Sequence, residues 1–124
     1  MNGFIVFGHG SRVESANEAV RAVAEKMARD GGHVVEPAFL ELGAPDLAGA
    51  VEKLAGRGVR RIVVIPYFLT LGTHLRRDLP ALVNEAGARH KDLDITITAP
   101  LDGHPALVQA LLDRAEAAIA GGTG

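Results

Sequence analysis

The chain has 124 residues, of which 48% are hydrophobic and 23% are charged, and its formal net charge is -2. This composition is typical of one soluble globular domain and not of a disordered chain. The slight negative charge and the aromatic content of 4% argue against nucleic-acid binding, which needs a dense basic face. The lack of cysteine excludes disulfides, thiolate nucleophiles and Cys-based metal sites, and leaves His, Asp and Glu as candidate metal ligands.

The first half of the chain is predicted to alternate between strands and helices. An apolar strand over Phe4–Phe7 is followed by a helix over Ser15–Arg29, and a second strand covers His33–Phe39. Asp46 is a good N-cap for a second helix that runs to Ala55. The apolar residues that lie at helical spacing in the first helix are Ala16, Val20, Val23, Ala24 and Met27.

The second half continues the alternation. A β-branched strand over Arg61–Pro66 is followed by a helix predicted from Leu79 to Ala88. A fourth strand covers Asp94–Thr98, and Pro105 suits the first turn of a last helix that ends near Ile119. No apolar run approaches the ~20 residues that span a bilayer, and no signal-peptide pattern is visible. We therefore expect a cytoplasmic protein without membrane contact.

Four consecutive strand–helix units predict an α/β fold with a parallel sheet, right-handed crossovers and helices on both faces. We expect a single three-layer domain over residues 1–120 and a frayed tail over residues 121–124. If the chain winds both ways from its first strand, the strand order is 2-1-3-4. Strands 1 and 3 are then neighbours at the switch point of the sheet.

Ligands of open α/β sheets bind outside the carboxyl ends of the strands, at the switch point. His9, Glu41, His74 and His104 follow the first, second, third and fourth predicted strands. We therefore expect His9 and His74 to face each other across one crevice. Two neutral imidazoles bind a first-row divalent ion and leave coordination positions open. The alternative for each histidine is a loop residue that makes one hydrogen bond.

The neighbours of these histidines allow both functional and ordinary interpretations. Gly10 and Gly72 would let the backbone approach a ligand, or they simply mark the ends of strands. Arg12, Arg76 and Arg77 would bind carboxylates of an acidic ligand, or they are solvated surface charges.

The two remaining polar residues at this edge also leave alternatives open. Glu41 would accept protons, orient a histidine or pair with an arginine. His104 would bind a ligand or cap the last helix. "GHGSR" lacks the G-x-S-x-G of a nucleophile elbow and the G-K-[ST] of a P-loop.

Four segments carry a family resemblance: "FGHGSR", "FLELGAPDL", "IPYFLTLGTHLRRDLP" and "PLDGHPALVQALLDR". Together they resemble the CbiX/SirB family of small class II tetrapyrrole chelatases, with the motifs in family order from about Gly3 to Ala117. The resemblance implies insertion of a divalent ion into sirohydrochlorin or a related tetrapyrrole, with cobalt as the leading candidate and iron or nickel as the alternatives. The metal is then a substrate, and no organic cofactor is implied.

The resemblance also implies roles for individual residues. The metal-handling and catalytic histidines fall on His9 and His74, and the catalytic carboxylate falls on Glu41. Longer chelatases hold two such halves around one cleft, so the resemblance implies a homodimer here. It also implies a place in the pathways to sirohaem, cobalamin or nickel tetrapyrroles. Substrate contacts are expected from Gly10, Ser11, Arg12, Gly72, Arg76, Arg77 and His104.

Three other functions remain open from the sequence. A non-catalytic carrier of metal or tetrapyrrole would use the same histidines without insertion. A hydrolase or phosphotransfer enzyme would use His9 or Ser11, although the expected motifs are missing. A purely structural interaction domain would use none of them. The sequence does not select among the metals, because imidazole binds several of them.

Overall fold

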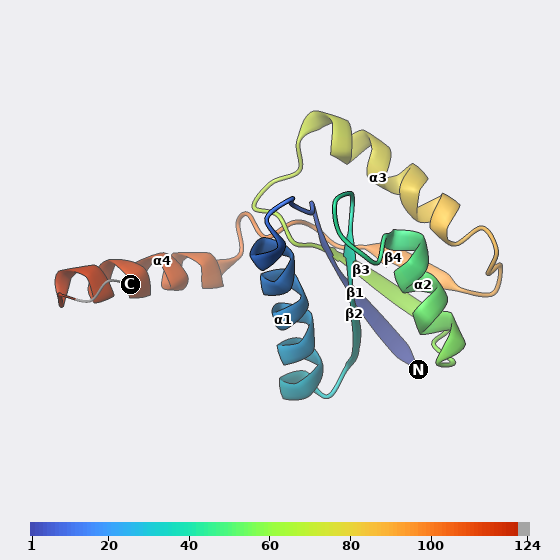
Figure 1. Cartoon of the computed structure of the whole chain (residues 1–124), viewed down its shortest axis with the longest axis horizontal. Coiled ribbons are helices and arrows are strands. Elements are labelled where there is room, and N and C mark those ends of the chain that lie inside the picture. The colour runs from blue at the N-terminus through green and yellow to red at the C-terminus, as the bar shows by residue number, and fades with distance from the viewer. Residues whose placement is uncertain (122–124) are drawn as a thin grey trace.

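The computed structural model describes residues 1–121. Its centre is a parallel four-stranded sheet with the order β2-β1-β3-β4, as the sequence predicts (Figure 1). The first and third strands are therefore neighbours, and their carboxyl ends form the expected switch point. The strands are β1 (Asn2–Gly8), β2 (Val34–Phe39), β3 (Arg61–Pro66) and β4 (Asp94–Ile97).

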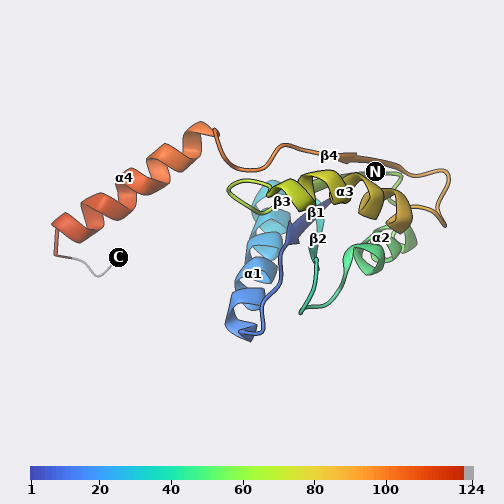
Figure 2. The same cartoon turned by 90° about the horizontal axis from the view of Figure 1, so that it is seen from above.

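Helices cover both faces of this sheet, which confirms the predicted layers. One face carries α1, and the other carries α2 and α3 (Figures 1 and 2). The last helix, α4, lies away from both faces in each view. The helices are α1 (Glu14–Gly31), α2 (Leu47–Gly56), α3 (Thr73–Ala86) and α4 (Pro105–Ile119).

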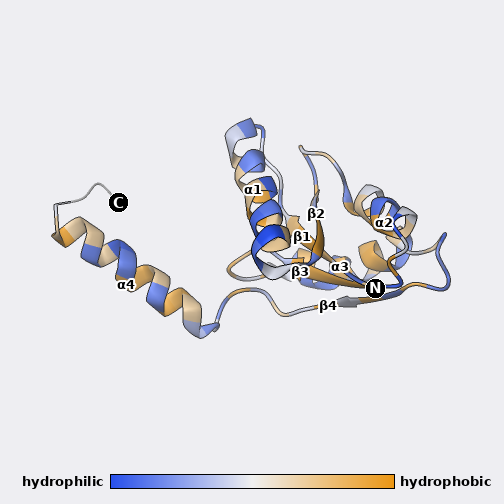
Figure 3. Cartoon of the chain, turned by 90° about the horizontal axis from the view of Figure 1, so that it is seen from below, coloured by the Kyte–Doolittle hydropathy of each residue, from blue (hydrophilic) through white to orange (hydrophobic). Residues whose placement is uncertain are grey.

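The strand alternation produces two apolar layers of unequal size. Ile5 and Phe7 of β1 point to the α2–α3 side, where the main core lies. Val6 points the other way and joins a small cluster with Ala24 of α1 and Val35 of β2. The hydropathy colouring shows mostly apolar strands next to helices that mix apolar and polar residues (Figure 3). Most of the stabilising burial is therefore on the α2–α3 side.

The third helix begins six residues before its predicted start and contains Pro80. The sequence prediction was wrong here because a proline inside a helix removes one backbone hydrogen bond and disfavours the preceding turn. A stripe at helical spacing outweighs that cost, since Leu79 and Val83 are buried and Leu75 packs against the same core. As a result, His74 lies in the first turn of α3 and not in a loop.

The buried face of α1 also differs from the predicted stripe. Asn17 and Ala24 are buried, whereas Ala16 and Val23 are exposed. Burial on this helix therefore does not follow hydrophobicity alone. A polar residue occupies the buried stripe where its side chain finds hydrogen-bond partners, as Asn17 does below.

Other boundaries agree closely with the sequence. β3 and α4 have the predicted bounds, and the Asp46 side chain caps α2 by accepting from the Gly49 N–H at 2.8 Å. The predicted frayed tail falls mainly on residues 122–124, outside the described residues. None of the helices within residues 1–121 combines the length and the apolar character that a bilayer crossing requires.

Candidate functional site

A cavity of about 480 Å³ lies at the switch point, between the ends of β1 and β3. His9, the first residue after β1, and His74, in the first turn of α3, both line it. The structure therefore brings these two histidines to one cavity. The complete lining is His9, Leu40, Gly72, Thr73, His74, Leu75, Asp78 and Leu82.

His9 is held where the chain segments after β1 and β2 run side by side. The Leu40 N–H donates to the Gly8 carbonyl at 3.0 Å, and the Glu41 N–H donates to the His9 carbonyl at 3.1 Å. This extension of the sheet pairing places Glu41 Oε2 3.5 Å from His9 Nε2, with both side chains exposed. A neutral His9 that directs its Nε2–H to this carboxylate leaves the Nδ1 lone pair free.

His74 has a different set of neighbours. Arg77 Nη2 lies 3.3 Å from His74 Nδ1, one turn further along α3. A guanidinium only donates hydrogen bonds, so Nδ1 accepts here and the proton of a neutral ring is on Nε2. Arg77 Nε also donates to Asp78 at 3.3 Å. Arg77, which the resemblance assigns to substrate, therefore contacts His74 and Asp78 in this structure.

Both histidines line the cavity, but each has its own polar neighbours. Within residues 1–121, no group of three His, Asp or Glu side chains is placed to hold one metal ion. His9 has Glu41 beside it, and His74 has Arg77. The arrangement is thus unlike a closed structural metal site, which has four protein ligands.

Gly10 allows the segments that carry His9 and Glu41 to approach each other. Its φ is +94°, and a Cβ there would lie 1.6 Å from the Glu41 carbonyl oxygen. The close approach expected at Gly10 is therefore made to the protein backbone. By contrast, Gly72 has an ordinary φ of -66°, and a Cβ there would meet no atom within 4 Å.

The side chain of Asn17 joins the same two segments by hydrogen bonds. It is 1% exposed, accepts from the Ser11 N–H at 2.9 Å, and donates to the Ser11 and Leu42 carbonyls at 2.9 and 2.8 Å. Leu42 is held at a φ of 56°, a left-handed conformation that is costly for leucine. Sequence reasoning missed Asn17, although its position on the buried side of α1 was a detectable signal.

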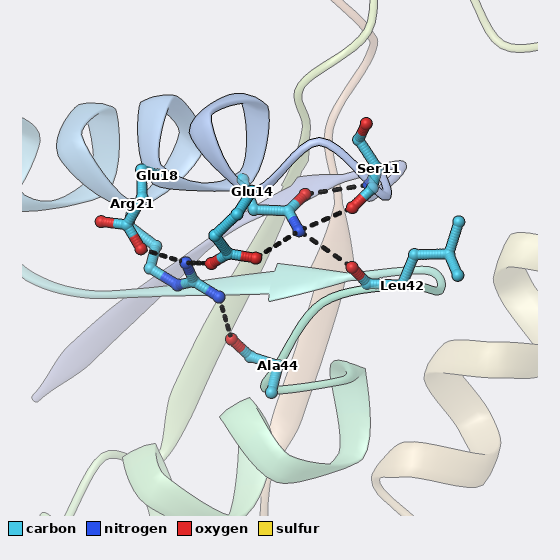
Figure 4. A network of polar contacts seen from close by, with 7 residues as sticks. Ser11, Glu14, Glu18, Arg21, Leu42 and Ala44 are labelled. Atoms are coloured by element: carbon cyan, nitrogen blue, oxygen red, sulfur yellow. Dashed lines mark hydrogen bonds and ion pairs between the residues drawn. The ribbon is translucent and has the colours of Figure 1, made fainter.

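An ion-pair group on α1 extends this attachment (Figure 4). Arg21 binds Glu14 at 2.6 Å, also pairs with Glu18, and donates to the Ala44 carbonyl at 3.1 Å. The hydrogen bond from Arg21, with a further one from Asn17, holds the pKa of the Glu14 carboxyl below its ordinary value. The β2–α2 segment is therefore attached to α1 at two places.

The remaining predicted residues have varied surroundings. The Ser11 hydroxyl accepts from the Val13 N–H at 3.0 Å, within its own loop. His104 caps α4, because its Nδ1 accepts from the Ala106 N–H at 3.0 Å. Arg12 and Arg76 are exposed. Substrate contacts by these residues remain predictions.

Apolar residues that sequence reasoning missed form much of the cavity wall. Leu40, Leu75 and Leu82 line it, and Leu40 and Leu82 also line a smaller neighbouring cavity of about 180 Å³. Leu75 was missed because the predicted helix began too late, whereas Leu82 was inside the predicted helix and Leu40 directly follows β2. Such a wall suits contact with the flat face of an apolar ring system.

Comparisons with known proteins agree with this geometry. The chain is 30% identical to the sirohydrochlorin cobaltochelatase of Methanothermobacter thermautotrophicus, covering 94% of this chain and 92% of the relative. It is 36% identical to the chloroplastic sirohydrochlorin ferrochelatase of Arabidopsis thaliana, covering 91% of this chain and 51% of that protein.

Solved structures show the same fold. The CbiX protein from Marinobacter aquaeolei VT8 superimposes with a TM-score of 0.85 at 29% identity, covering 96% of this chain and 98% of that chain. The sirohydrochlorin chelatase SirB from Bacillus subtilis subspecies spizizenii, in complex with cobalt, gives 0.84 at 28% identity, covering 93% and 50%. The sequence profile of the CbiX family matches residues 3–118. The chain therefore belongs to the CbiX family.

Proposed function

We propose that this protein is a chelatase that inserts a divalent metal ion into sirohydrochlorin or a closely related tetrapyrrole. Cobalt is the leading candidate for the ion, and iron and nickel are the alternatives. The observation that carries the proposal is that His9 and His74 line one open cavity at the switch point of a CbiX-family chain. The related proteins named as cobaltochelatase and ferrochelatase support the same reaction class.

In the proposed mechanism, the His9 ring is already oriented for metal binding, whereas the His74 ring is not. Glu41 orients the His9 ring and leaves its Nδ1 lone pair for the ion, as carboxylate–histidine pairs do at metal sites. His74 binds the ion after its ring has released Arg77, whose 3.3 Å contact occupies Nδ1. Two imidazole ligands leave the ion open to the tetrapyrrole nitrogens, which replace them as insertion proceeds.

Insertion also requires two pyrrole N–H protons to leave. Glu41 is a suitable acceptor, because its carboxylate is exposed at the cavity edge beside His9. The leucines of the wall would contact one face of the macrocycle. Arg12 and Arg76, and Arg77 once released from His74, would pair with its acidic side chains.

A single chain forms one wall of this site, and we propose that a second copy forms the other. The cavity is open, as expected for half of a cleft, and the SirB chain is about twice as long as the part that superimposes. A homodimer would restore an enclosed site. We also propose that the protein is cytoplasmic, which cell fractionation can test.

The direct test is insertion kinetics with Co²⁺, Ni²⁺ and Fe²⁺, followed by the visible spectrum of sirohydrochlorin. We expect His9→Ala and His74→Ala to lower the rate by at least ~100-fold, because each removes a group that contacts the reacting ion. His33→Ala is the matched control, because His33 packs on Phe4 before β2, at the other end of the strands. Unaltered rates in both site variants would overturn the proposal.

Acidic conditions provide a second test of the same ligands. Only unprotonated imidazole binds a metal ion, so the insertion rate should fall as the pH is lowered while circular dichroism shows an intact fold. A rate that is unchanged at acidic pH would contradict histidine ligation.

A carrier of metal or tetrapyrrole is the second candidate, because it would use the same two histidines at the same cavity. A carrier would bind both ligands without accelerating their reaction. Titration of sirohydrochlorin with the protein, with and without cobalt, separates the two functions. Binding with an unaccelerated spectral change would identify the carrier.

A further inference from the structure

The last helix carries an apolar stripe that its own chain leaves uncovered. No residue of α4 is buried within the described part of the chain. The helix lies away from the sheet and the other helices in both views (Figures 1 and 2), and its surface alternates between apolar and polar sides (Figure 3). The stripe contains Val108, Leu111, Leu112, Ala115 and Ile119, and the exposures of its four large side chains are 60%, 70%, 50% and 86%.

The sheet has a matching uncovered area on the face that carries α1. Among the strands, that helix packs mainly on β1 and β2. On the same face, Val63 and Ile65 of β3 pair in register with Phe4 and Val6 of β1, and both are half-buried outside the two core clusters. Thr96 of β4 lies beside Val63 and is exposed. This half of the face, defined by Val63, Ile65 and Thr96, is called the open face below.

The segment before α4 fixes where that helix starts. The Thr98 N–H donates to the Val64 carbonyl at 3.0 Å, and those of Leu101 and Asp102 donate to the Phe68 and Leu69 carbonyls. These bonds hold the segment on the body of the protein up to the His104 cap. From that point α4 leads away from its own open face (Figure 2).

We propose that α4 docks on the open face of a second copy of this chain, and that the partner's α4 docks back in the same way. The molecule carries both an uncovered helix and an uncovered sheet face, so one two-fold arrangement covers all four surfaces and closes. The proposal gives surfaces to the homodimer proposed above, and its test does not depend on the chelatase reaction.

The expected size of the contact fits a stable dimer. A helix of 15 residues is about 22 Å long and about 10 Å across, so burying half of it against an equal area removes about 700 Å² from water. Two reciprocal contacts bury about 1,400 Å², which is within the standard range of about 1,200–2,000 Å² for stable interfaces. Exchange also places the second copy near the site, because the anchored segment pairs with Phe68, whose ring contacts His9.

Two substitutions on α4 test the apolar stripe. Leu112 is on the stripe, and Ala110 is two residues earlier and so on nearly the opposite side of the helix. We expect wild-type protein to sediment as a dimer, and Leu112→Glu to weaken dimerisation by at least ~100-fold by placing a charge in the contact. Ala110→Glu adds the same charge and should remain a dimer. A monomeric wild type, or a Leu112→Glu dimer of unchanged affinity, would overturn the proposal.

Folding of the variants is not at risk, because both positions are exposed within one chain. Circular dichroism and thermal unfolding at low concentration should therefore give the same signals for both glutamate variants. A loss of helix in Leu112→Glu but not in Ala110→Glu at a concentration where both are monomers would contradict the proposed free position of α4.

Cross-linking tests which surface receives the helix. Because the natural sequence has no cysteine, only the introduced cysteines can form a disulfide. One chain carries Thr96→Cys, and a second chain of different mass carries Val108→Cys, Leu111→Cys or Leu112→Cys. We expect oxidation of the mixture to give the mixed disulfide dimer for at least one stripe position and none for Ala110→Cys. Absence at all three positions would overturn the proposal. So would an intramolecular disulfide in a dilute chain that carries both cysteines, since its own helix would then cover the open face.

Discussion

The two histidines of the site differ in how firmly the protein holds their surroundings. The His9 side is fastened by backbone pairing, by the buried amide of Asn17 and by the Arg21 group. On the His74 side, α3 begins at Gly72 without a side-chain cap. Within residues 1–121, the only side-chain hydrogen bond of the His74 ring is the one with Arg77. The segment that carries His9 is thus held by more contacts than the first turn of α3, which carries His74.

This difference suits a protein that must bind an ion and then give it up. A fully organised pair would hold the ion in the ground state, and binding that is equally strong in ground and transition states does not accelerate the reaction. A fixed His9 and an adjustable His74 let one contact break before the other. The comparison therefore predicts that changes on the His9 side affect the fold, whereas equal changes on the His74 side do not.

The largest expected effect comes from a pair of glycine substitutions. Gly10→Ala places a Cβ 1.6 Å from the Glu41 carbonyl at a φ of +94°, so the two segments must separate. We expect a loss of about 3 kcal/mol or more in unfolding free energy, measured by urea titration. Gly72→Ala should cost under about 1 kcal/mol, because its φ is ordinary and the space is open. Equal losses would remove the proposed asymmetry.

A smaller effect is expected for Asn17→Leu. The substitution keeps the size of the buried side chain but leaves the Ser11 N–H and the Leu42 carbonyl without this partner. We expect a loss of about 2–3 kcal/mol in unfolding free energy, by the penalty for buried unpaired polar groups. Insertion by the folded variant should slow as well, with faster hydrogen exchange at residues 9–12 and 40–43.

The control for that substitution is Asn84→Leu, since Asn84 is exposed on α3. It should change the unfolding free energy by no more than about 0.5 kcal/mol. If Asn17→Leu were as mild as this control, Asn17 would not be what fastens the two segments.

The smallest expected effect is a pH dependence on the outer side of α1. Because Arg21 holds the pKa of Glu14 below 4.5 in the folded chain, the charged carboxylate adds stability above that pH. This contribution is lost as the pH falls through the lowered folded value. In the Glu14→Gln variant, the unfolding free energy should therefore decrease less as the pH is lowered. In the Glu25→Gln variant, further along the same helix, it should decrease as much as in the wild type. Identical acid profiles for the two variants would contradict this attachment.

Much of the fold was readable from the sequence because apolar periodicity reports local structure directly. The layers followed from four alternating units, and β3 was predicted to the residue. The strand order also required the assumption that the chain winds both ways from its first strand, and the structure has that order. The start of α3 was missed because Pro80 is an unfavourable local signal that only the packing of Leu75 and Leu79 outweighs. The shared cavity of His9 and His74 was predictable because parallel strands end at one edge.

What the sequence alone determined is thus the α/β alternation and the presence of a histidine after the first and after the third strand, since each of these depends on residues close together in the chain. Only the tertiary structure decided that Gly10 is needed by the Glu41 backbone, that Asn17 joins two segments, and that α4 lies apart from the sheet. These features depend on which distant groups meet, and a backbone hydrogen-bond partner or an uncovered face leaves no periodic signal in the sequence.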